Sequence, residues 1–316
     1  MRFNSGAATM LRVAAVAGLL LAPLAPGAAA RAETEIQAGV ASVDITPREP
    51  VWMAGFASRD KPSQSVAAPL RAKALAIRDS AGNLTVIVTS DLIGIRRAVA
   101  DIVARRCLDK YGLARERLLL NASHTHSGPE LSLGGSAAQT ARSERQQVTE
   151  RYTSELLDKL VHLVGEAIGG LAPAKLEFGQ GLAGFAVNRR RSRPNTRHLP
   201  GPVDHDVPVL SVRAPDGSFR AILFGYACHP TTLSAYVITP DYPGYAQAEI
   251  EKLYPGSVAL FLQGCGADSN PLPRFHSEDP ILVRRSLELS ESYGKVLAAA
   301  VDLTLRGKLT PVAGPI

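Results

Sequence analysis

The chain has 316 residues, of which 20% are charged, and a formal net charge of +6 at pH 7. This charge is too mild to indicate nucleic-acid binding, and the length suits one large domain or two small ones. The three cysteines, Cys107, Cys228 and Cys265, allow one disulfide at most, and their pairing stays open. They exclude a disulfide scaffold and a zinc site built on CxxC pairs.

The N-terminal segment has the three parts of an export signal. Arg2 and Arg12 flank or precede an apolar core, 13–21, that is shorter than the about 20 residues of a bilayer-spanning helix, and Ala-rich cleavage positions follow. We predict a signal peptide over residues 1–32, whose removal lowers the net charge to about +3. A buried N-terminal helix is the alternative. The mature protein is then exported, either periplasmic or secreted, with at most peripheral membrane contact.

Segments of strand and helix composition alternate over residues 33–316 without a repeat or a low-complexity linker, which favours a single α/β domain. The second and third strands flank the turn residues 79–83 and are predicted to form an antiparallel hairpin. Apolar spacing then predicts two long helices on either side of a short buried strand. In chain order these elements are strands 36–46, 70–78 and 84–90, helix 95–111, strand 118–120 and helix 145–169.

The second half of the chain continues the alternation. Residues 215–218 (PDGS) are a strong turn signal between two strands, which predicts a second hairpin. Asp241 precedes Tyr242-Pro243 and is expected to cap the start of a helix. The elements are strands 174–186, 207–213 and 219–228, helix 241–253, strand 257–263 and helix 279–305, with no closing element expected after Pro311. The predicted fold class is α/β, with mixed β-sheets flanked by helices.

Polar groups capable of chemistry follow three of the predicted strands. They are His124-Thr125-His126, Cys228-His229, and a Gly-rich turn that carries Asp268. Ligands bind at the carboxyl ends of strands in open α/β sheets. His-x-His is a recurrent metal-ligand spacing, because alternate extended residues project both imidazoles the same way, although a hydrogen-bonded structural pair is an equal alternative. We therefore expect a metal site at these strand ends.

Several motifs resemble, in order, those of the neutral, non-lysosomal ceramidase family. The segment NASHTHSGPE at 121–130 is similar to the HTHSGP signature of that family. Other similar segments are GVASVDITP at 39–47, MAGFA at 53–57, TSDLIG at 89–94, VNRRRS, YACHPTT and DYPGYA. The resemblance implies the N-terminal catalytic domain of a zinc-dependent amide hydrolase. Its implied substrate is a small-molecule lipid amide, a ceramide-like sphingolipid that is cleaved to a sphingoid base and a fatty acid.

Residue by residue, the resemblance implies that His124 and His229 are zinc ligands. It implies that His126 and Arg189 are catalytic residues in the substrate shell, which donate hydrogen bonds to the substrate or to the oxyanion. Neutral imidazoles suit Zn²⁺ well. Zinc-activated water attacks an amide carbonyl in such sites, and cationic donors stabilise the resulting charge.

The chain departs from the family in two places. The family's remaining zinc ligands, a glutamate and a tyrosine, have no counterpart here, so either Asp241 or Asp268 substitutes or the chain is a piece of a longer domain. The family's GDVSPN turn reads GADSNP at 266–271, so no catalytic role is carried over to Ser269, which we interpret as a turn serine. These departures keep two alternatives open: a hydrolase of another amide or ester, and a non-catalytic exported binding domain.

Other polar residues receive structural interpretations. Asp44 and Asp91 either orient imidazoles or cap local backbone. The sequence His205-Asp206 is interpreted as a structural turn. No function is assigned to His162, His198 or His276. The basic cluster Arg190, Arg191, Arg193 and Arg197 is interpreted as a solvated loop, with contact to an anionic lipid surface or a substrate carboxylate as the alternative.

Overall fold

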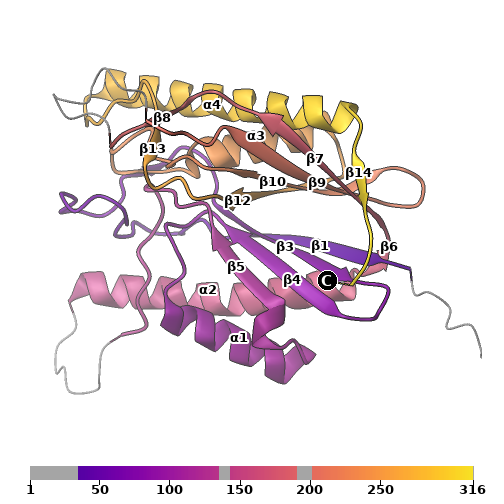
Figure 1. Ribbon diagram of the computed structural model, residues 1–316. Coiled ribbons are helices and arrows are strands. Elements are labelled where there is room, and N and C mark those ends of the chain that lie inside the picture. Colours follow the sequence, from indigo (N-terminus) through magenta and orange to yellow (C-terminus); the bar gives the residue numbers. More distant parts are fainter. Residues whose placement is uncertain (1–34, 135–142, 191–200, 316) are drawn as a thin grey trace, which may run out of the picture. The chain divides into compact units, whose positions relative to one another are not determined.

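Two mixed β-sheets pack face to face, and a pair of helices covers each outer face (Figure 1). This computed structural model describes residues 35–134, 143–190 and 201–315. The predicted signal peptide lies outside the described residues. From Thr34 onward the chain forms one compact unit. The α/β class with mixed sheets flanked by helices is therefore confirmed.

The first sheet has the strand order β5-β4-β3-β1-β6. Strands β3 and β4 form the predicted antiparallel hairpin, whereas β4 and β5 run parallel and are connected through helix α1. Helix α2 begins with a capping box at Ser143, and α1 ends at Gly112 in the left-handed conformation. The elements are β1 (Gln37–Asp44), β3 (Arg71–Arg78), β4 (Leu84–Ser90), β5 (Leu118–Ala122), β6 (Ala172–Pro173), α1 (Arg97–Tyr111) and α2 (Glu144–Gly169).

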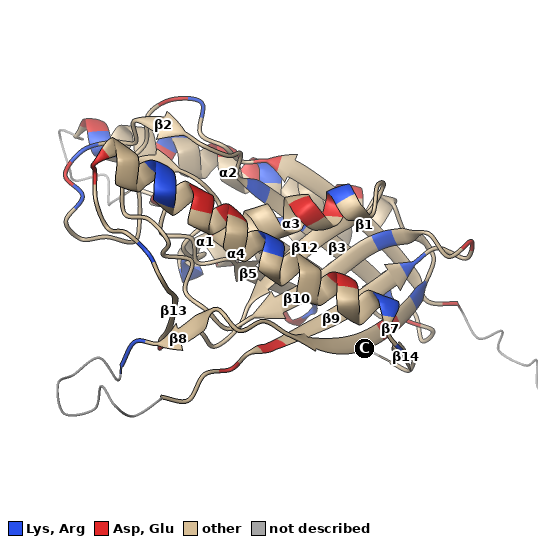
Figure 2. Ribbon diagram, turned by 90° about the horizontal axis from the view of Figure 1, so that it is seen from above, with Lys and Arg blue, Asp and Glu red and all other residues tan. Residues whose placement is uncertain are grey.

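The second sheet has the order β12-β10-β9-β7-β14, and it too ends in one parallel pair, β10 with β12. Strands β9 and β10 form the second predicted hairpin. Opposite charges form ion pairs one turn apart along the exposed side of α4 (Figure 2). The elements are β7 (Lys175–Leu182), β9 (Asp206–Arg213), β10 (Phe219–Tyr226), β12 (Val258–Gln263), β14 (Thr310–Val312), α3 (Asp241–Leu253) and α4 (Pro280–Arg306).

Two short ribbons and a 3-10 turn complete the described elements. Strand β2 (Ser65–Val66) pairs with β11 (Val237–Ile238), β8 (Ala186–Asn188) pairs with β13 (Ser269–Pro271), and the 3-10 turn η1 spans Arg115–Arg117. The predicted strand 174–186 is therefore two strands. The break places Phe185 against the aromatic rings of the second core.

The expectation that no element closes the chain was wrong. Strand β14 pairs antiparallel with β7, with Pro311 opposite Glu177. Proline cannot donate to a ladder, but an edge strand tolerates it. The sheet gains a partner for β7, and Val312 packs against the apolar cluster between the sheets.

The parallel pairs of the two sheets end side by side. The side chain of Asn121, near the end of β5, accepts a hydrogen bond from Gln263 N at 3.1 Å, at the end of β12. Because β4 is parallel to β5 and β10 is parallel to β12, the loops that follow all four strands emerge in one region. This arrangement brings together chain segments that are distant in sequence.

Lys73 crosses the interface between the sheets. Its side chain lies on β3 and is nearly buried, and Nζ donates to Glu251 Oε1 at 2.6 Å and to the Ala259 carbonyl at 2.8 Å. Glu251 Oε1 also accepts from Ala259 N at 3.0 Å. A buried ammonium is tolerated only when such partners satisfy it. The ion pair thus links the first sheet to α3 and β12.

We predict that Lys73→Met lowers the free energy of unfolding by about 2–3 kcal/mol, because Glu251 and the Ala259 carbonyl lose their buried donor. Lys295→Met is the matched control, since Lys295 pairs with Glu291 on the exposed side of α4. It should change stability by about 0.5 kcal/mol or less. Guanidinium denaturation of both variants decides, and equal small effects would contradict the role of Lys73.

Candidate metal centre

His124 lies directly after β5 and is fixed by the loop that follows β4. Its backbone N–H donates to the Leu92 carbonyl at 2.9 Å, and its ring Nδ1 lies 2.7 Å from the Ile93 carbonyl oxygen. A carbonyl only accepts, so Nδ1 carries the proton and Nε2 is left with its lone pair. The backbone of His124 is left-handed, with φ 67°, which is uncommon for a residue other than glycine. Two contacts therefore hold an unusual conformation.

His229 follows β10 and is held in the same way. Its N–H donates to the Ser269 carbonyl at 2.9 Å, and Nδ1 lies 3.0 Å from the Gly266 carbonyl oxygen. Glycine is required at 266, because a Cβ there would come within 2.4 Å of the Cys228 backbone nitrogen. Burial lowers the pKa of His229, which favours the neutral form of the ring, the form that ligates a metal.

The ring of His126 has no hydrogen-bond partner. Both of its nitrogens are buried and unpaired within the described part of the chain, whereas its backbone N–H donates to the Pro230 carbonyl at 3.2 Å. Burial, followed by the charges of His124 and His229, lowers the pKa of His126 to about 3. A buried polar ring without a partner is costly, so its position indicates a ligand or a substrate contact.

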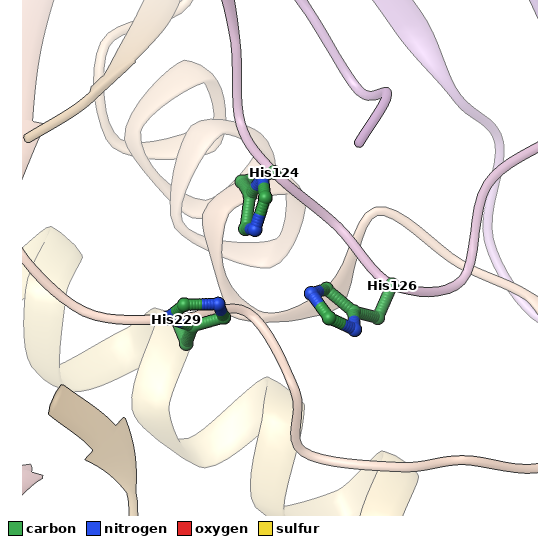
Figure 3. A group of neighbouring side chains, drawn as sticks. All are labelled: His124, His126 and His229. Carbon is green, nitrogen blue, oxygen red and sulfur yellow. The ribbon is translucent and has the colours of Figure 1, made fainter. Parts of the chain in front are cut away.

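The three imidazoles face one another (Figure 3). Their centroids are 4.8 Å apart for His124 and His229, 5.1 Å for His124 and His126, and 5.4 Å for His126 and His229. One nitrogen from each lies within 4.8 Å of the others, so the group can hold a metal ion. Thr125 between the first two donates its hydroxyl to the Thr239 carbonyl at 3.0 Å. The expectation that an extended His-x-His segment aligns the two imidazoles was wrong, because the backbone at His124 is left-handed.

The donor set fits zinc. Three neutral imidazoles are a common protein ligand set for Zn²⁺, and the carbonyl contacts of Nδ1 fix the tautomer of His124 and His229 with Nε2 free. The two predicted ligands are thus brought together. His126 belongs to the same group, so its expected place in the substrate shell and not among the ligands stays a prediction.

Arg189 lies beside the cluster, at the end of β8. Its N–H donates to the Asp268 carbonyl at 2.7 Å and its Nε to the Ala267 carbonyl at 2.9 Å. Asn188, the residue before it, pairs with Ser269, whose carbonyl accepts from His229 N, so Arg189 lies next to the segment that holds His229. Arg191, Arg193 and Arg197 of the basic cluster lie outside the described residues, as does His198.

The two aspartates proposed as substitute ligands lie outside the histidine group. Asp241 is fully buried, and its carboxylate accepts from the N–H and hydroxyl of Thr232, from Tyr242 N and from the Ser290 hydroxyl. The carboxylate of Asp268 accepts from the Asn188 side chain at 3.2 Å. Both carboxylates therefore stabilise loops around the cluster.

Neither Asp44 nor Asp91 orients a histidine. Asp44 accepts from Thr46 N at 2.7 Å, and the buried Asp91 accepts from Arg71 N at 2.8 Å. Backbone carbonyls take the orienting role in their place. Ser269 behaves as the expected turn serine, since its hydroxyl donates to Asp268 at 3.3 Å while its carbonyl holds His229.

The remaining structural interpretations have mixed outcomes. His205 Nδ1 lies 3.0 Å from the Ala183 carbonyl, as expected for a structural turn. His276, to which no function was assigned, lies with its ring 5.2 Å from that of Phe56 and its Nε2 3.3 Å from the Thr231 carbonyl oxygen. All three cysteines are free thiols, so the one disulfide that their number allowed does not form.

The sequence analysis did not identify Arg59, whose guanidinium holds the backbone of the loops around His126. It is 8% exposed and donates to the carbonyls of Ala54 and His126, both at 2.6 Å, and to those of Ser234 and Ala235 at 3.1 Å. Burial lowers its pKa to about 10, so it stays charged at neutral pH. A single arginine in a loop carries no sequence signal of this kind, because its partners are backbone atoms of distant segments.

A pocket of about 400 Å³ lies beside the histidines. Gly55 lines it, and a Cβ there would come within 2.6 Å of the His126 ring. Ile93, whose carbonyl orients His124, also lines it, together with Ile95 and Leu131. Another, largely apolar pocket of about 410 Å³ lies between β5 and the second sheet. No histidine of the described ranges lines either pocket, and the first pocket is placed beside the cluster by Gly55 and Ile93.

Comparison with known proteins agrees with this geometry. The neutral ceramidase of Pseudomonas aeruginosa superposes with a TM-score of 0.73 at 24% identity, over 89% of this chain and 46% of that chain. A ceramidase complexed with C2 superposes with a TM-score of 0.72 at 24% identity, over 89% of this chain and 45% of that one. This chain thus spans about half the length of these solved relatives, and the likeness shows the fold.

The family comparison goes further than the fold. A family model described as neutral/alkaline non-lysosomal ceramidase, N-terminal, matches residues 36–271, which include all three histidines of the cluster and Arg189. The match covers most of the chain and supports a ceramidase-like hydrolase. The chain therefore belongs to the neutral/alkaline non-lysosomal ceramidase family, of which it carries the N-terminal domain.

Proposed function

We propose that this protein is a zinc-dependent amide hydrolase that cleaves the N-acyl amide of ceramide-like sphingolipids to a sphingoid base and a fatty acid. The observation that carries the proposal is the convergence of three imidazoles at the strand ends of a ceramidase fold. Two of them are oriented by backbone carbonyls with Nε2 free to ligate. Such convergence has no structural use without a ligand, because it leaves the ring of His126 buried and unpaired.

In this proposal His124 and His229 hold the ion. When bound, zinc supplies Lewis-acid chemistry, which lowers the pKa of water and polarises an amide carbonyl. The chain's own residues do the rest. His126 stays neutral at physiological pH and donates its ring N–H to the substrate or to the developing oxyanion, while Arg189 presents a permanent positive charge to the same oxygen.

The pocket beside the cluster is suited to one chain of a lipid amide. Ile93, Ile95 and Leu131 supply apolar walls, and Arg96 and Glu130 supply charged ones. Gly55 also lines the pocket and packs closely on the His126 ring, so the pocket reaches the histidine cluster. Export through residues 1–32 belongs to this proposal as well. None of the described helices is long and apolar enough to cross a membrane.

We predict that His124→Ala and His229→Ala each abolish stoichiometric zinc binding while the domain stays folded, because the apolar cores lie elsewhere. Elemental analysis after dialysis and circular dichroism measure the two properties. His162→Ala is the matched control, since His162 is exposed on α2. Full zinc occupancy in both site variants would refute the assignment of the ligands.

We predict that His126→Ala and Arg189→Ala retain zinc but lower the turnover number for a short-chain ceramide by about 10²–10³-fold, as expected for loss of an oxyanion donor. Steady-state kinetics with the zinc-loaded protein measure the turnover number. Arg190→Ala is the control, because Arg190 is the exposed neighbour of Arg189. Zinc loss in the His126 variant would make that residue a ligand. Unchanged turnover in the Arg189 variant would show that Arg189 has no catalytic role and belongs to the solvated basic cluster. If the protein binds zinc but shows no chelator-sensitive turnover of any amide, a non-catalytic binding domain is favoured.

A further inference from the structure

The ring of His126 is held by packing, whereas the other two imidazoles of the cluster are held by hydrogen bonds. Nδ1 of His124 and Nδ1 of His229 each lie against a backbone carbonyl oxygen. His126 has no such contact within the described part of the chain, since both of its ring nitrogens are buried and unpaired. A side chain without hydrogen bonds can rotate about its torsions unless neighbouring atoms prevent it. The orientation of His126 therefore depends on the atoms that pack against its ring.

The turn 54–59 supplies such atoms. Gly55 has a φ of 107°, and its backbone approaches so closely that a Cβ on it would come within 2.6 Å of the His126 ring. The next residue, Phe56, places its ring centroid 5.1 Å from that of His126, with the two ring planes at 67°. Edge-to-face contact of this kind is directional, because the positive edge of one ring meets the negative face of the other. Gly55 and Phe56 together limit the rotation of the imidazole.

Arg59 fixes this turn relative to His126. Its Nη1 donates to the Ala54 carbonyl and to the His126 carbonyl, both at 2.6 Å, so one guanidinium nitrogen joins the two segments. Ala54 N also donates to the Gly128 carbonyl at 3.0 Å. The Cζ atom of Arg59 lies 4.9 Å from the centroid of the Phe56 ring, a cation–π contact. The position of the Phe56 ring is therefore set from the segment that carries His126.

His276 also contacts Phe56. Their ring centroids are 5.2 Å apart, and the ring planes meet at 74°. Nε2 of His276 lies 3.3 Å from the Thr231 carbonyl oxygen, which ties this histidine to the segment after β10. The Phe56 ring thus contacts the side chains of Arg59, His126 and His276, which leave it little freedom to move. A rigid neighbour is what an imidazole without hydrogen bonds needs if it is to keep one orientation.

We propose that Phe56 is a positioning residue for His126, which sets the orientation of the imidazole while both ring nitrogens stay available. A hydrogen bond from a neighbouring group would occupy one nitrogen, as the carbonyls do at His124 and His229. An aromatic contact orients the ring and occupies neither nitrogen. The inference rests on the proposed function, in which His126 donates its ring N–H to the substrate. The orientation of the ring can nevertheless be measured without turnover.

Phe56→Leu tests the proposal, because leucine keeps an apolar side chain at this position and removes the aromatic contact. Two-dimensional ¹H–¹⁵N spectra of the zinc-free full chain report the imidazole nitrogens, and His126→Ala identifies the signals of that ring. We expect the His126 signals to shift or broaden in Phe56→Leu, while those of His124 and His229 keep their positions because their carbonyl partners remain. Phe56→Tyr keeps the ring and should retain the wild-type signals.

Steady-state kinetics of the zinc-loaded protein with a short-chain ceramide give the second readout. We expect kcat of Phe56→Leu to fall by about 10–10²-fold while KM changes by less than about twofold, because a misplaced catalytic group affects the chemical step more than binding. Phe56→Tyr should restore kcat. A merely structural role for Phe56 would lower the amount of folded protein and leave the kcat of the folded fraction unchanged.

Phe219→Leu is the matched control. Phe219 also meets an aromatic ring edge-on, that of Tyr254 at 4.8 Å, and also lies under a guanidinium, with the Arg213 Cζ at 3.7 Å. It is the first residue of β10, whereas the histidine cluster lies after the last residue of that strand. Phe219→Leu should change neither the imidazole signals nor kcat.

Unchanged His126 signals in a folded Phe56→Leu protein, equal changes in Phe219→Leu, or shifted signals with an unchanged kcat would each overturn the inference and leave the hydrolase proposal standing. If Phe56→Leu does not fold, Phe56→Met, which keeps more of the side-chain volume, takes its place with the same expected results. Shifted His126 signals in Phe56→Leu, together with a wild type that hydrolyses no amide, would support the orienting contact and contradict the hydrolase proposal alone.

Discussion

The hydrogen bonds from two imidazole Nδ1 atoms to backbone carbonyls are the contacts on which the site depends. Ile93 and Gly266 supply these carbonyls, and each lies in the loop after a strand that is parallel to the strand before its histidine. The ring orientation is therefore set by the sheet itself. A side-chain carboxylate in the same orienting role would add a negative charge and side-chain rotamer freedom to the cluster. A backbone carbonyl adds neither.

This arrangement requires that two sheets place their parallel edges together. Antiparallel neighbours would send consecutive strand ends to opposite edges, so the one parallel pair in each sheet is what gathers four loops. Asn121 at the end of β5 and Lys73 in the first sheet hold the second sheet in place by hydrogen bonds to Gln263, Ala259 and Glu251. The histidine cluster therefore lies on a well-packed scaffold. Because the surrounding structure fixes the loop, it can hold His124 in a left-handed backbone conformation.

Positive charge is the second property of the site. Arg59 fixes the backbone of His126 from the buried side, and Arg189 follows β8 and donates to the Ala267 and Asp268 carbonyls. Arg59 satisfies carbonyls and keeps loops together. Arg189 is the arginine that is proposed to contact the substrate carbonyl. The site therefore combines three imidazoles with positive charge on two sides.

Much of this fold follows from local sequence signals. The helices beginning at Arg97, Glu144, Asp241 and Pro280 were predicted to within two residues, because apolar periodicity is local. The expectation that Asp241 caps its helix was wrong, since Asp241 is the first helical residue and the helix has no side-chain cap at its start. Strands of two or three residues, including β8, β13 and β14, are too short for any periodicity and form only because a distant partner exists. The histidines were found from their spacing and family motifs. Their carbonyl partners and Arg59 were not, since those contacts join segments that tertiary packing alone brings together.

X-ray absorption at the zinc edge of the full chain tests the central claim most directly. The account predicts one zinc per chain, with imidazole nitrogen scattering at about 2.0–2.1 Å, and the loss of this zinc in His229→Ala. Zinc that binds with sulfur scattering at about 2.3 Å, or an unchanged imidazole shell in His229→Ala, would contradict it.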